Sequence, residues 1–220
     1  MNPAPAPDHT FRIVDSPVLY FGTPVVLISS LNEDDTINLA PMSSAWWVGQ
    51  SAMLGLDASS QTTLNLRRTG ECVLNLASSD MVNSVDRLAL FTGTPVLPPH
   101  KAAKGYESCR DKFEIAGLSP IASDLVAAPR VAQCAVQLEA RVKREHPFAG
   151  DGTFLVAFEL AIIRVHIAEA MMVDGSDRYI DPQRWDPLIM KFCEFYGHGQ
   201  RLHESRLALG WSMPGRQRGR

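Results

Sequence analysis

Two short polar clusters carry residue types that could bind a ligand. The first is SSQTT, at residues 59–63, where an apolar segment ends and a helical pattern begins. Hydroxyl groups and free backbone N–H groups at a helix start form a seat for phosphate, because the helix dipole is positive there. Simple helix capping would use the same residues. The candidate phosphate ligands are Ser59, Ser60, Thr62, Thr63 and Asn65.

The second cluster is NLAPMSSAWW, at residues 38–47, which begins like a strand and is expected to break at Pro41. Its amides and hydroxyls could bind the polar edge of a planar ring. Trp46 and Trp47 could flank that ring, with one of them in the core. A phosphate and a planar polar ring together describe flavin mononucleotide (FMN). The ring-binding candidates are Ala40, Pro41, Met42, Ser43, Ser44, Ala45 and Trp46.

No other pattern offers catalysis by side chains alone, and no catalytic residue is assigned. The sequence lacks a GxSxG elbow, an HExxH motif and a phosphate-binding P-loop. Its histidines are scattered, and His166 is expected to be structural. The cysteines form no CxxC pair and have no spacing for a metal, and Cys72 and Cys134 stand in apolar contexts that predict burial. An enzyme of this kind takes its chemistry from a cofactor.

Composition narrows the class of protein. A chain of 220 residues with 45% hydrophobic residues is long enough for one domain with a full core. The formal charge of −3 argues against nucleic-acid binding. The start of the chain lacks the features of a signal peptide. The apolar segment 153–172 carries charged residues and falls short of a membrane span. We therefore expect a cytoplasmic protein with no membrane partner.

The elements that would position the clusters are mostly strands. Alternating or buried apolar runs predict strands at 24–30, 36–40, 51–58, 71–77, 134–145 and 153–172. The run at 134–145 predicts a strand with a solvated polar face, whereas the run at 153–172 predicts burial on both faces. Short helices are predicted from the Ser60 cap to Gly70, and after a cap at Ser79 or Asp80. Residues 92–123 form a long loop of the kind that often completes a site.

Several segments together resemble the flavin reductase-like family of FMN-binding split β-barrel proteins. These are NLAPMS at 38–43, SQTTLNL at 60–66, GECVLNL at 70–76, the stretch KFEIAGLSPIASDLVAAPRVAQCAVQLEARV and EFYGHG near the end. The resemblance covers roughly residues 15–200, flanked by a flexible N-terminus at 1–14 and a C-terminal extension at 201–220. It implies a mainly β, antiparallel, Greek-key-like split barrel with short inserted helices.

The resemblance also implies a homodimer that binds FMN near the subunit interface. The segment 40–45 would line the ring, and residues 59–63 would hold the phosphate. NAD(P)H would deliver hydride to the flavin. One departure weakens this last step, because many relatives carry Gly-Asp-His where this chain has Gly150-Asp151-Gly152. His146 is the nearest candidate to replace the missing histidine.

Three functions therefore stay open. The first is an FMN-dependent reductase that passes electrons to free flavin, a partner oxygenase or a small acceptor. The second is a flavoredoxin-like electron carrier, which would bind FMN without oxidising NAD(P)H and would exchange electrons with a redox protein. The third is a non-catalytic binding module on the same barrel. An oligomer is expected in each case, because a strand that is apolar on both faces needs cover from more than one sheet.

Overall fold

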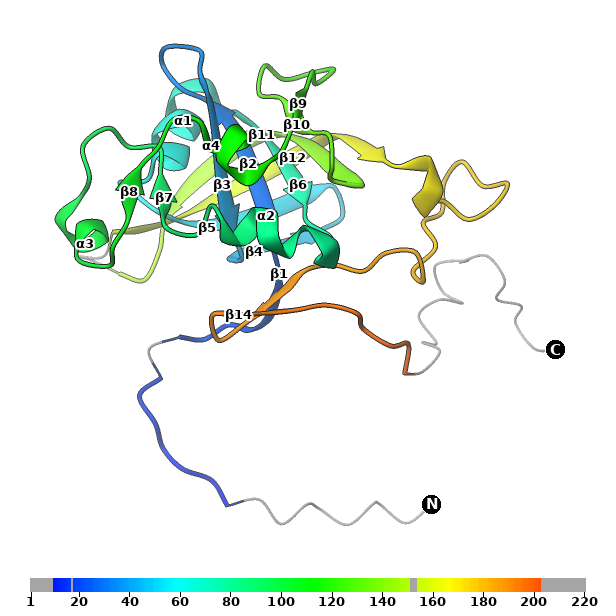
Figure 1. The fold of residues 1–220 in the computed structure, drawn as a ribbon, viewed down its shortest axis with the longest axis horizontal. Helices are drawn as coiled ribbons and strands as arrows, with labels where there is room; N and C mark the ends of the chain where they lie inside the picture. Colours follow the sequence, from blue (N-terminus) through cyan, green and yellow to red (C-terminus); the bar gives the residue numbers. More distant parts are fainter. Residues whose placement is uncertain (1–9, 17, 151–153, 203–220) are drawn as a thin grey trace.

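A seven-stranded antiparallel sheet forms the core of the molecule, and its strands follow the order β3-β2-β6-β11-β12-β5-β4 (Figure 1). The computed structural model describes residues 10–16, 18–150 and 154–202. The strands of this sheet are β2 (Val26–Leu31), β3 (Ile37–Met42), β4 (Ala45–Val48), β5 (Ser51–Asp57), β6 (Glu71–Leu76), β11 (Val136–Pro147) and β12 (Leu155–Ile167). Each apolar run that predicted a strand contributes one of them.

The sheet rolls into a barrel that is split between its two outer strands, β3 and β4. The chain passes from one to the other through Ser43 and Ser44, and the Gly55 N–H donates to the Ser44 carbonyl at 2.8 Å. Apolar side chains from β2, β4, β5, β6, β11 and β12 pack inside the barrel, among them Ile28, Leu54 and Leu74. Met42 of β3 packs against this core. The predicted mainly β split barrel with short helices is confirmed.

Helix α1 (Gln61–Thr69) covers one end of the barrel. It begins as predicted at Ser60, whose side chain accepts a hydrogen bond from the Thr63 N–H. It ends at Gly70, which adopts a left-handed conformation with φ of 69°. Leu66 is buried on its inner face among the barrel residues. The helix is therefore fixed to the barrel, and its N-terminus stands at the end of β5.

Two strand predictions need correction. The chain does not break at Pro41, because β3 continues through Pro41 to Met42. β3 is an outer strand, and proline is tolerated there because no further strand needs its missing N–H group. The polar face of β11 is also not solvated throughout, since Gln137 and Glu139 are buried. A loop at 122–131 covers them, and its backbone or side chains bond to both residues.

The segment from 77 to 131 packs outside the barrel in short pieces. The predicted second helix is a 3₁₀ turn, η1 (Ser79–Met81), followed by α2 (Val82–Asp86). Neither Ser79 nor Asp80 caps it, because the chain enters the turn at Ser78 and Asp80 already lies inside. The other pieces are β7 (Phe91–Thr92), α3 (Pro99–Ala102), β8 (Glu107–Ser108), α4 (Lys112–Ala116), β9 (Pro120–Ile121) and β10 (Arg130–Val131).

A separate three-stranded sheet joins the two ends of the described chain. It contains β1 (Phe21–Pro24), β13 (Ile189–Lys191) and β14 (Glu194–Tyr196), and it extends below the barrel in Figure 1. Between β12 and β13 the chain forms η2 (Glu169–Met171) and an irregular segment. Residues 10–14 have no regular structure, while 1–9 and 203–220 lie outside the described residues.

The prediction of burial on both faces holds for the first half of β12. Val156, Ala157 and Phe158 are buried in succession, but Val165 in the second half is exposed. Among the residues described, no helix has the length and apolar character needed to cross a membrane.

Candidate functional site

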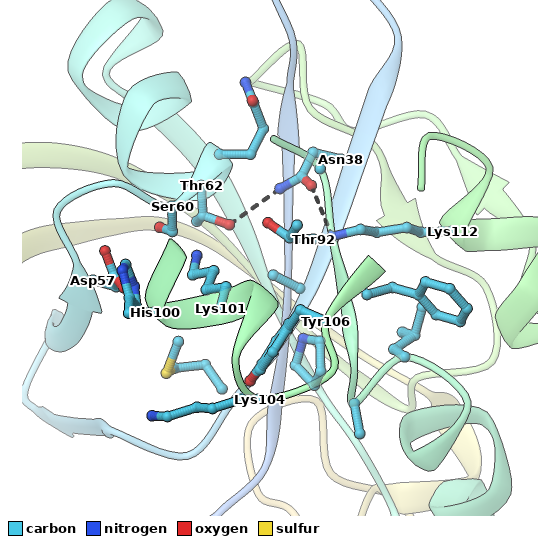
Figure 2. Close-up of a pocket in the computed structure, with 18 residues that line it drawn as sticks. Asn38, Asp57, Ser60, Thr62, Thr92, His100, Lys101, Lys104, Tyr106 and Lys112 are labelled. Carbon is cyan, nitrogen blue, oxygen red and sulfur yellow. Dashed lines mark hydrogen bonds and ion pairs between the residues drawn. The ribbon is translucent and has the colours of Figure 1, made fainter. Parts of the chain in front are cut away.

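A cavity of about 210 Å³ lies between β3, the start of α1 and the loop that follows β6 (Figure 2). One wall is apolar and includes Pro41, Met42 and Phe91. The other wall is polar and basic. Figure 2 shows the Lys101 and Lys112 side chains on the loop side of the cavity, facing the side of Ser60, Thr62 and Asn38. The cavity therefore combines positive charge, hydroxyl groups and an apolar surface.

The structure brings together five of the predicted ligands at this cavity. Its lining includes Ala40, Pro41, Met42, Ser60 and Thr62. Ser59 stands beside it and donates its N–H and hydroxyl to Asp57 Oδ1 at 2.7 and 2.6 Å.

The other predicted ligands point elsewhere. Thr63 and Asn65 are fully buried under the helix, where Thr63 donates to the Asp57 carbonyl and Asn65 donates to Ser30 and Asn32. Beyond β3, Ser43 is buried, and Ser44 bonds the Tyr20 hydroxyl at 2.9 Å. Ala45 belongs to the barrel core, the partly buried Trp47 packs against that core, and Trp46 is 58% exposed.

Lys112 supplies a buried cation to the cavity. Its side chain is 3% exposed, and its Nζ donates to Asn38 Oδ1 at 3.2 Å. Asn38 in turn donates to Thr62 Oγ1 at 3.1 Å, which ties the lysine to the start of α1. Burial lowers the pKa of Lys112 to about 8; nearby Cys109 opposes this shift, and the Lys101 charge adds to it. A bound anion would stabilise the charged form of Lys112, because burial has removed the water that would otherwise solvate it.

His100 and Asp57 form a second polar pair at the rim. His100 Nε2 donates to Asp57 Oδ2 at 2.8 Å, since an ionised carboxylate only accepts. Burial raises the pKa of Asp57, but the hydrogen bonds from Ser59 and His100 outweigh it and hold that pKa below its ordinary value. The His100 ring also stacks on Phe154 at 6.2 Å between centroids. The pair fastens the loop that carries Lys101 and Lys104 to the end of β5.

Gly93 allows the loop to approach the barrel closely. A Cβ atom at this position would stand 2.5 Å from Asn38 Oδ1 and 3.0 Å from the Gln61 side chain. No real side chain tolerates such a contact. The glycine therefore sets the distance between the loop and the helix, and hence the width of the cavity.

The sequence interpretation missed the loop residues of this site, although it predicted that a loop would complete it. The signal was the cluster PPHKAAK at 98–104, in which three basic or imidazole side chains fall on one or two helical turns. The lining residues outside the predicted set are Asn38, Asp57, Gln61, Leu88, Ala89, Phe91, Thr92, Gly93, His100, Lys101, Lys104, Tyr106 and Lys112.

The Gly-Asp-His position of many relatives falls at residues 150–152 of this chain. Residues 151–153 lie outside the described chain. His146, the suggested replacement, pairs with Glu159 at 3.4 Å on the neighbouring strand and does not line the cavity. Among the described residues, the histidine that lines the cavity is His100, which comes from the loop.

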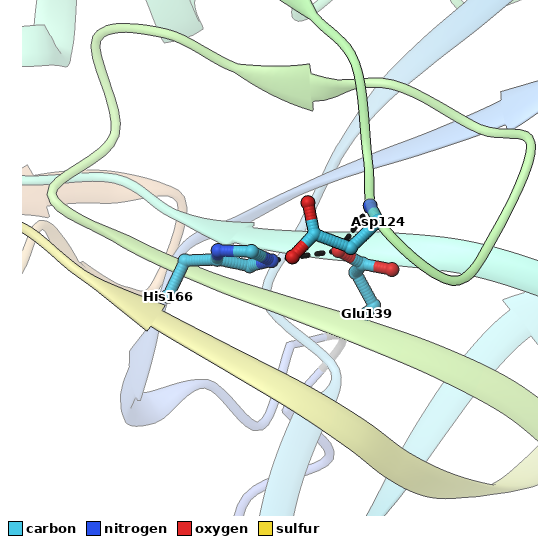
Figure 3. A group of neighbouring side chains, drawn as sticks. All are labelled: Asp124, Glu139 and His166. Atoms are coloured by element: carbon cyan, nitrogen blue, oxygen red, sulfur yellow. Dashed lines mark hydrogen bonds and ion pairs between the residues drawn. The ribbon is translucent and has the colours of Figure 1, made fainter.

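A second polar cluster joins Asp124, Glu139 and His166 (Figure 3). Glu139 is fully buried and accepts hydrogen bonds from the backbone N–H groups of Asp124 and Leu125 at 2.9 and 2.6 Å, and from His166 Nε2 at 2.6 Å. Asp124 pairs with Arg164 at 2.7 Å. These contacts satisfy the buried carboxylate and anchor the loop at 122–131, with His166 as one of the donors.

Comparison with known proteins agrees with the fold. Residues 18–180 match the family described as "Flavin reductase like domain". The chain is 33% identical over 192 residues to the uncharacterized protein YdfE of Bacillus subtilis (strain 168), covering 87% of this chain and 91% of that one.

Solved structures show the same barrel. Flavoredoxin of Desulfovibrio vulgaris (Miyazaki F) superposes with a TM-score of 0.73 at 20% identity, over 90% of this chain and 99% of the other. Nitrilotriacetate monooxygenase component B from Bacillus cereus gives 0.67 at 21% identity, over 84% and 88%. On this evidence the chain belongs to the flavin reductase-like family of split-barrel proteins.

Proposed function

We propose that this protein binds FMN in the cavity beside α1 and acts as an FMN-dependent oxidoreductase that accepts hydride from NAD(P)H. The observation that carries the proposal is the convergence of a helix N-terminus and the buried Lys112 on one cavity with an apolar wall. A helix N-terminus and a poorly solvated cation both favour phosphate. Membership of the flavin reductase-like family supports a flavin as the molecule that carries it.

The residues present fit a mononucleotide. Thr62 and Ser60 offer hydroxyls at the start of α1, while Lys101 and Lys112 offer charge from the facing loop. Asp57, the acidic residue of the lining, is already held by His100 and Ser59. It therefore repels an incoming phosphate less than a free carboxylate would.

The protein's part in the reaction would be to bind, orient and exclude water. FMN, when bound, supplies a ring that takes up hydride and passes electrons on. Transfer between stacked rings depends mainly on proximity and orientation, so it needs no catalytic triad. The lysines would neutralise the phosphate, and Pro41 and Met42 would give an apolar surface beside it. The His100–Asp57 pair would keep the loop over the site.

The size of the cavity supports a homodimer as part of this proposal. Pockets that enclose a drug-sized ligand usually measure roughly 300–1,000 Å³, and this one measures about 210 Å³. One chain would therefore enclose only part of FMN. A second copy over the rim would complete the enclosure, as the family resemblance implies. The expected cytoplasmic location is kept with this proposal.

A flavoredoxin-like electron carrier is the second candidate. The specific observation in its favour is the Gly150-Asp151-Gly152 sequence, which lacks the histidine of many reductases. Such a carrier would keep the FMN site and exchange electrons with a protein partner. A non-catalytic module on the same barrel would have neither bound flavin nor NAD(P)H oxidation.

The visible absorption spectrum separates these functions. Purified protein is incubated with FMN, freed of excess ligand and scanned, and NADH or NADPH is then added without oxygen. Retained flavin that bleaches supports the reductase. Retained flavin that bleaches only with a reduced redox protein supports the carrier. A colourless protein that fails to quench FMN fluorescence would refute both. Lys112→Met should lose the flavin, whereas the exposed Lys143→Met should retain it.

A further inference from the structure

A second cavity, of about 290 Å³, opens at the other end of the barrel from helix α1. Helix α1 connects the end of β5 to the beginning of β6. The second cavity instead contacts Gln50, just before β5, and Leu76, at the end of β6. Val136 at the beginning of β11 and Ile167 at the end of β12 also line it. We call this cavity the barrel hollow. Among the described residues, none lines both this hollow and the cavity of the proposed flavin site.

The wall of the barrel hollow is almost entirely apolar. None of the described residues that line it carries a charge, and the only polar side-chain groups among them are the Gln50 amide and the indole N–H groups of Trp47 and Trp185. The lining consists of Trp47, Gly49, Gln50, Leu76, Val136, Leu138, Ile162, Val165, Ile167, Ile180 and Trp185. Water binds weakly over such a wall, because it finds few hydrogen-bond partners there. An apolar guest is therefore favoured over water.

The barrel hollow is recessed and not part of a flat surface. Leu76, Val136 and Leu138, which form its floor, are only 7%, 7% and 8% exposed. Val165 at the rim is 47% exposed. This gradient from a buried floor to an exposed rim fits a molecule small enough to enter past Val165.

The outer wall of the barrel hollow is held in place by the segment between β12 and β13. Ile180 and Trp185 come from this segment, which lies beyond the end of β12 in Figure 1. Ile180 pairs with Met172, and Arg184 donates to the Met172 carbonyl at 2.7 Å. The Asp186 carbonyl accepts from the Ser79 N–H at 2.9 Å. These bonds fix the wall before any ligand arrives, which reduces the cost of ordering on binding.

We infer that the barrel hollow is a binding site for a small, neutral, apolar molecule. Its volume is roughly twice that of an apolar cavity of about 150 Å³ that binds benzene. A guest of one or two rings therefore fits. The two tryptophans suit a planar guest, and Gln50 at the mouth can bond one polar group on it. Barrels of this size are known to hold one small ligand in the mouth.

The test uses Prodan, a neutral two-ring naphthalene probe with one ketone group, whose emission increases and shifts to shorter wavelength in apolar surroundings. The probe is titrated into FMN-free protein, and its emission is read both directly and through energy transfer from tryptophan. We expect saturable binding with transfer, because Trp47 and Trp185 form part of the wall. FMN at saturation should leave the probe bound, which separates this site from the proposed flavin site.

Three variants locate the probe. Val165→Glu places a charge at the rim, and Val165→Trp fills the mouth with an apolar side chain. Each should weaken probe binding at least about tenfold, the equivalent of 1.4 kcal/mol. Val48→Glu is the matched control, because Val48 is exposed on β4 but does not line the hollow. Circular dichroism checks that each variant is folded, and Val165→Trp serves if Val165→Glu is not.

Four results would overturn the inference. The first three are failure of the wild-type protein to bind the probe, displacement of the probe by FMN, and equal probe affinity of wild type and the Val165 variants. The fourth is a lower sedimentation coefficient for Val165→Glu than for wild type, combined with no probe binding by wild type. The last result would identify the hollow as a contact between two copies of the chain. A wild-type protein that binds the probe but not FMN would refute the proposed function and leave this inference unaffected.

Discussion

The ammonium group of Lys112 lies 3.2 Å from the side-chain oxygen of Asn38, and both residues are almost fully buried beside the start of helix α1. Asn38 is neutral, no carboxylate among the described residues contributes to the pKa of Lys112, and nearby Cys109 offsets only part of the effect of burial. The buried charge is therefore compensated only in part. A buried cation without a counter-ion is unfavourable for folding, and it is explained if the site serves an anionic ligand.

Replacing Lys112 by methionine should separate binding from stability. We expect the affinity for FMN to fall about ten- to hundredfold, as for the loss of one charged hydrogen bond of roughly 1.5–3 kcal/mol. The free energy of unfolding at pH 7 should rise by about 1–2 kcal/mol, because the buried charge is removed. FMN fluorescence quenching and urea unfolding measure the two effects. Lys143→Met should change neither, and a Lys112→Met protein with unchanged affinity would contradict the assignment.

The pH dependence of folding follows from the same residue. The pKa of Lys112 falls from 10.5 to about 8 on burial. Between these values the unfolded chain binds more protons than the folded chain, so the Lys112 contribution to stability increases with pH in this window. The unfavourable effect is complete below about pH 8. Wild type and Lys112→Met should therefore differ most in unfolding free energy at pH 7 and converge near pH 10. A difference that grows with pH would contradict the burial of a charged lysine.

Gly93 should tolerate no side chain. An alanine Cβ would collide with Asn38 Oδ1 at 2.5 Å, so Gly93→Ala must displace the loop or the asparagine. We expect a loss of about 1–3 kcal/mol in stability, as for overpacking in a well-packed region, together with weaker FMN binding. Thermal unfolding and fluorescence titration measure these effects. Gly199→Ala is the control, because open space surrounds that position. Equal behaviour of the two variants would show that the loop is not closely packed.

Glu139→Gln should release the loop at 122–131. Burial raises the pKa of Glu139, but hydrogen bonds from Asp124, His166 and Leu125 outweigh it, and the pKa lies below its ordinary 4.5. Its contribution to stability is present above pH 4.5 and is lost as pH falls through the lowered value. We expect a cost of about 1–3 kcal/mol at pH 7, because the amide nitrogen cannot accept the backbone hydrogen bonds. Proteolysis of the loop and urea unfolding report it, and the half-exposed Glu159→Gln is the control.

The turn between β13 and β14 should be improved by glycine. Phe192 and Cys193 form its two central residues and have φ of 49° and 68°. Both angles are left-handed, which favours glycine or asparagine in a two-residue hairpin. Phe192 packs edge-on against Phe21 with ring centroids 4.9 Å apart, so it has a reason to stay. Cys193→Gly should raise the free energy of unfolding by about 0.5–1 kcal/mol. An unchanged or lower stability would mean that the cysteine side chain makes a contribution of its own.

The sequence predicted the barrel better than the site, and the reason is physical. Strand and helix signals are local. Each of them predicts its element from a few neighbouring residues, as do the Ser60 cap, Gly70 and the apolar runs. The cavity depends on contacts across the chain, such as Lys112 with Asn38, 74 positions apart. No local pattern reports such a distance. The hydroxyls at 59–63 were recognisable because a helix start is itself a local feature.

The buried polar face of β11 shows the same limit. Alternation correctly placed Val136 and Leu138 inside the barrel, but it could not reveal that a loop covers Gln137 and Glu139 from outside. Glutamate is a normal residue on a solvated face, and its burial becomes favourable only with the donors of residues 124 and 125. Residues 40–42 were found for their amides, although the structure also uses them as an apolar wall.

Pro41 has one more consequence, which concerns the behaviour of the protein at high concentration. An outer strand exposes unpaired backbone groups, and such an edge can recruit a strand from another molecule and start aggregation. Proline has no N–H group to offer to an incoming strand, and β3 carries it at the fifth of its six residues. The opposite edge, β4, has only four residues. The barrel can therefore remain split without becoming a template for intermolecular sheet growth.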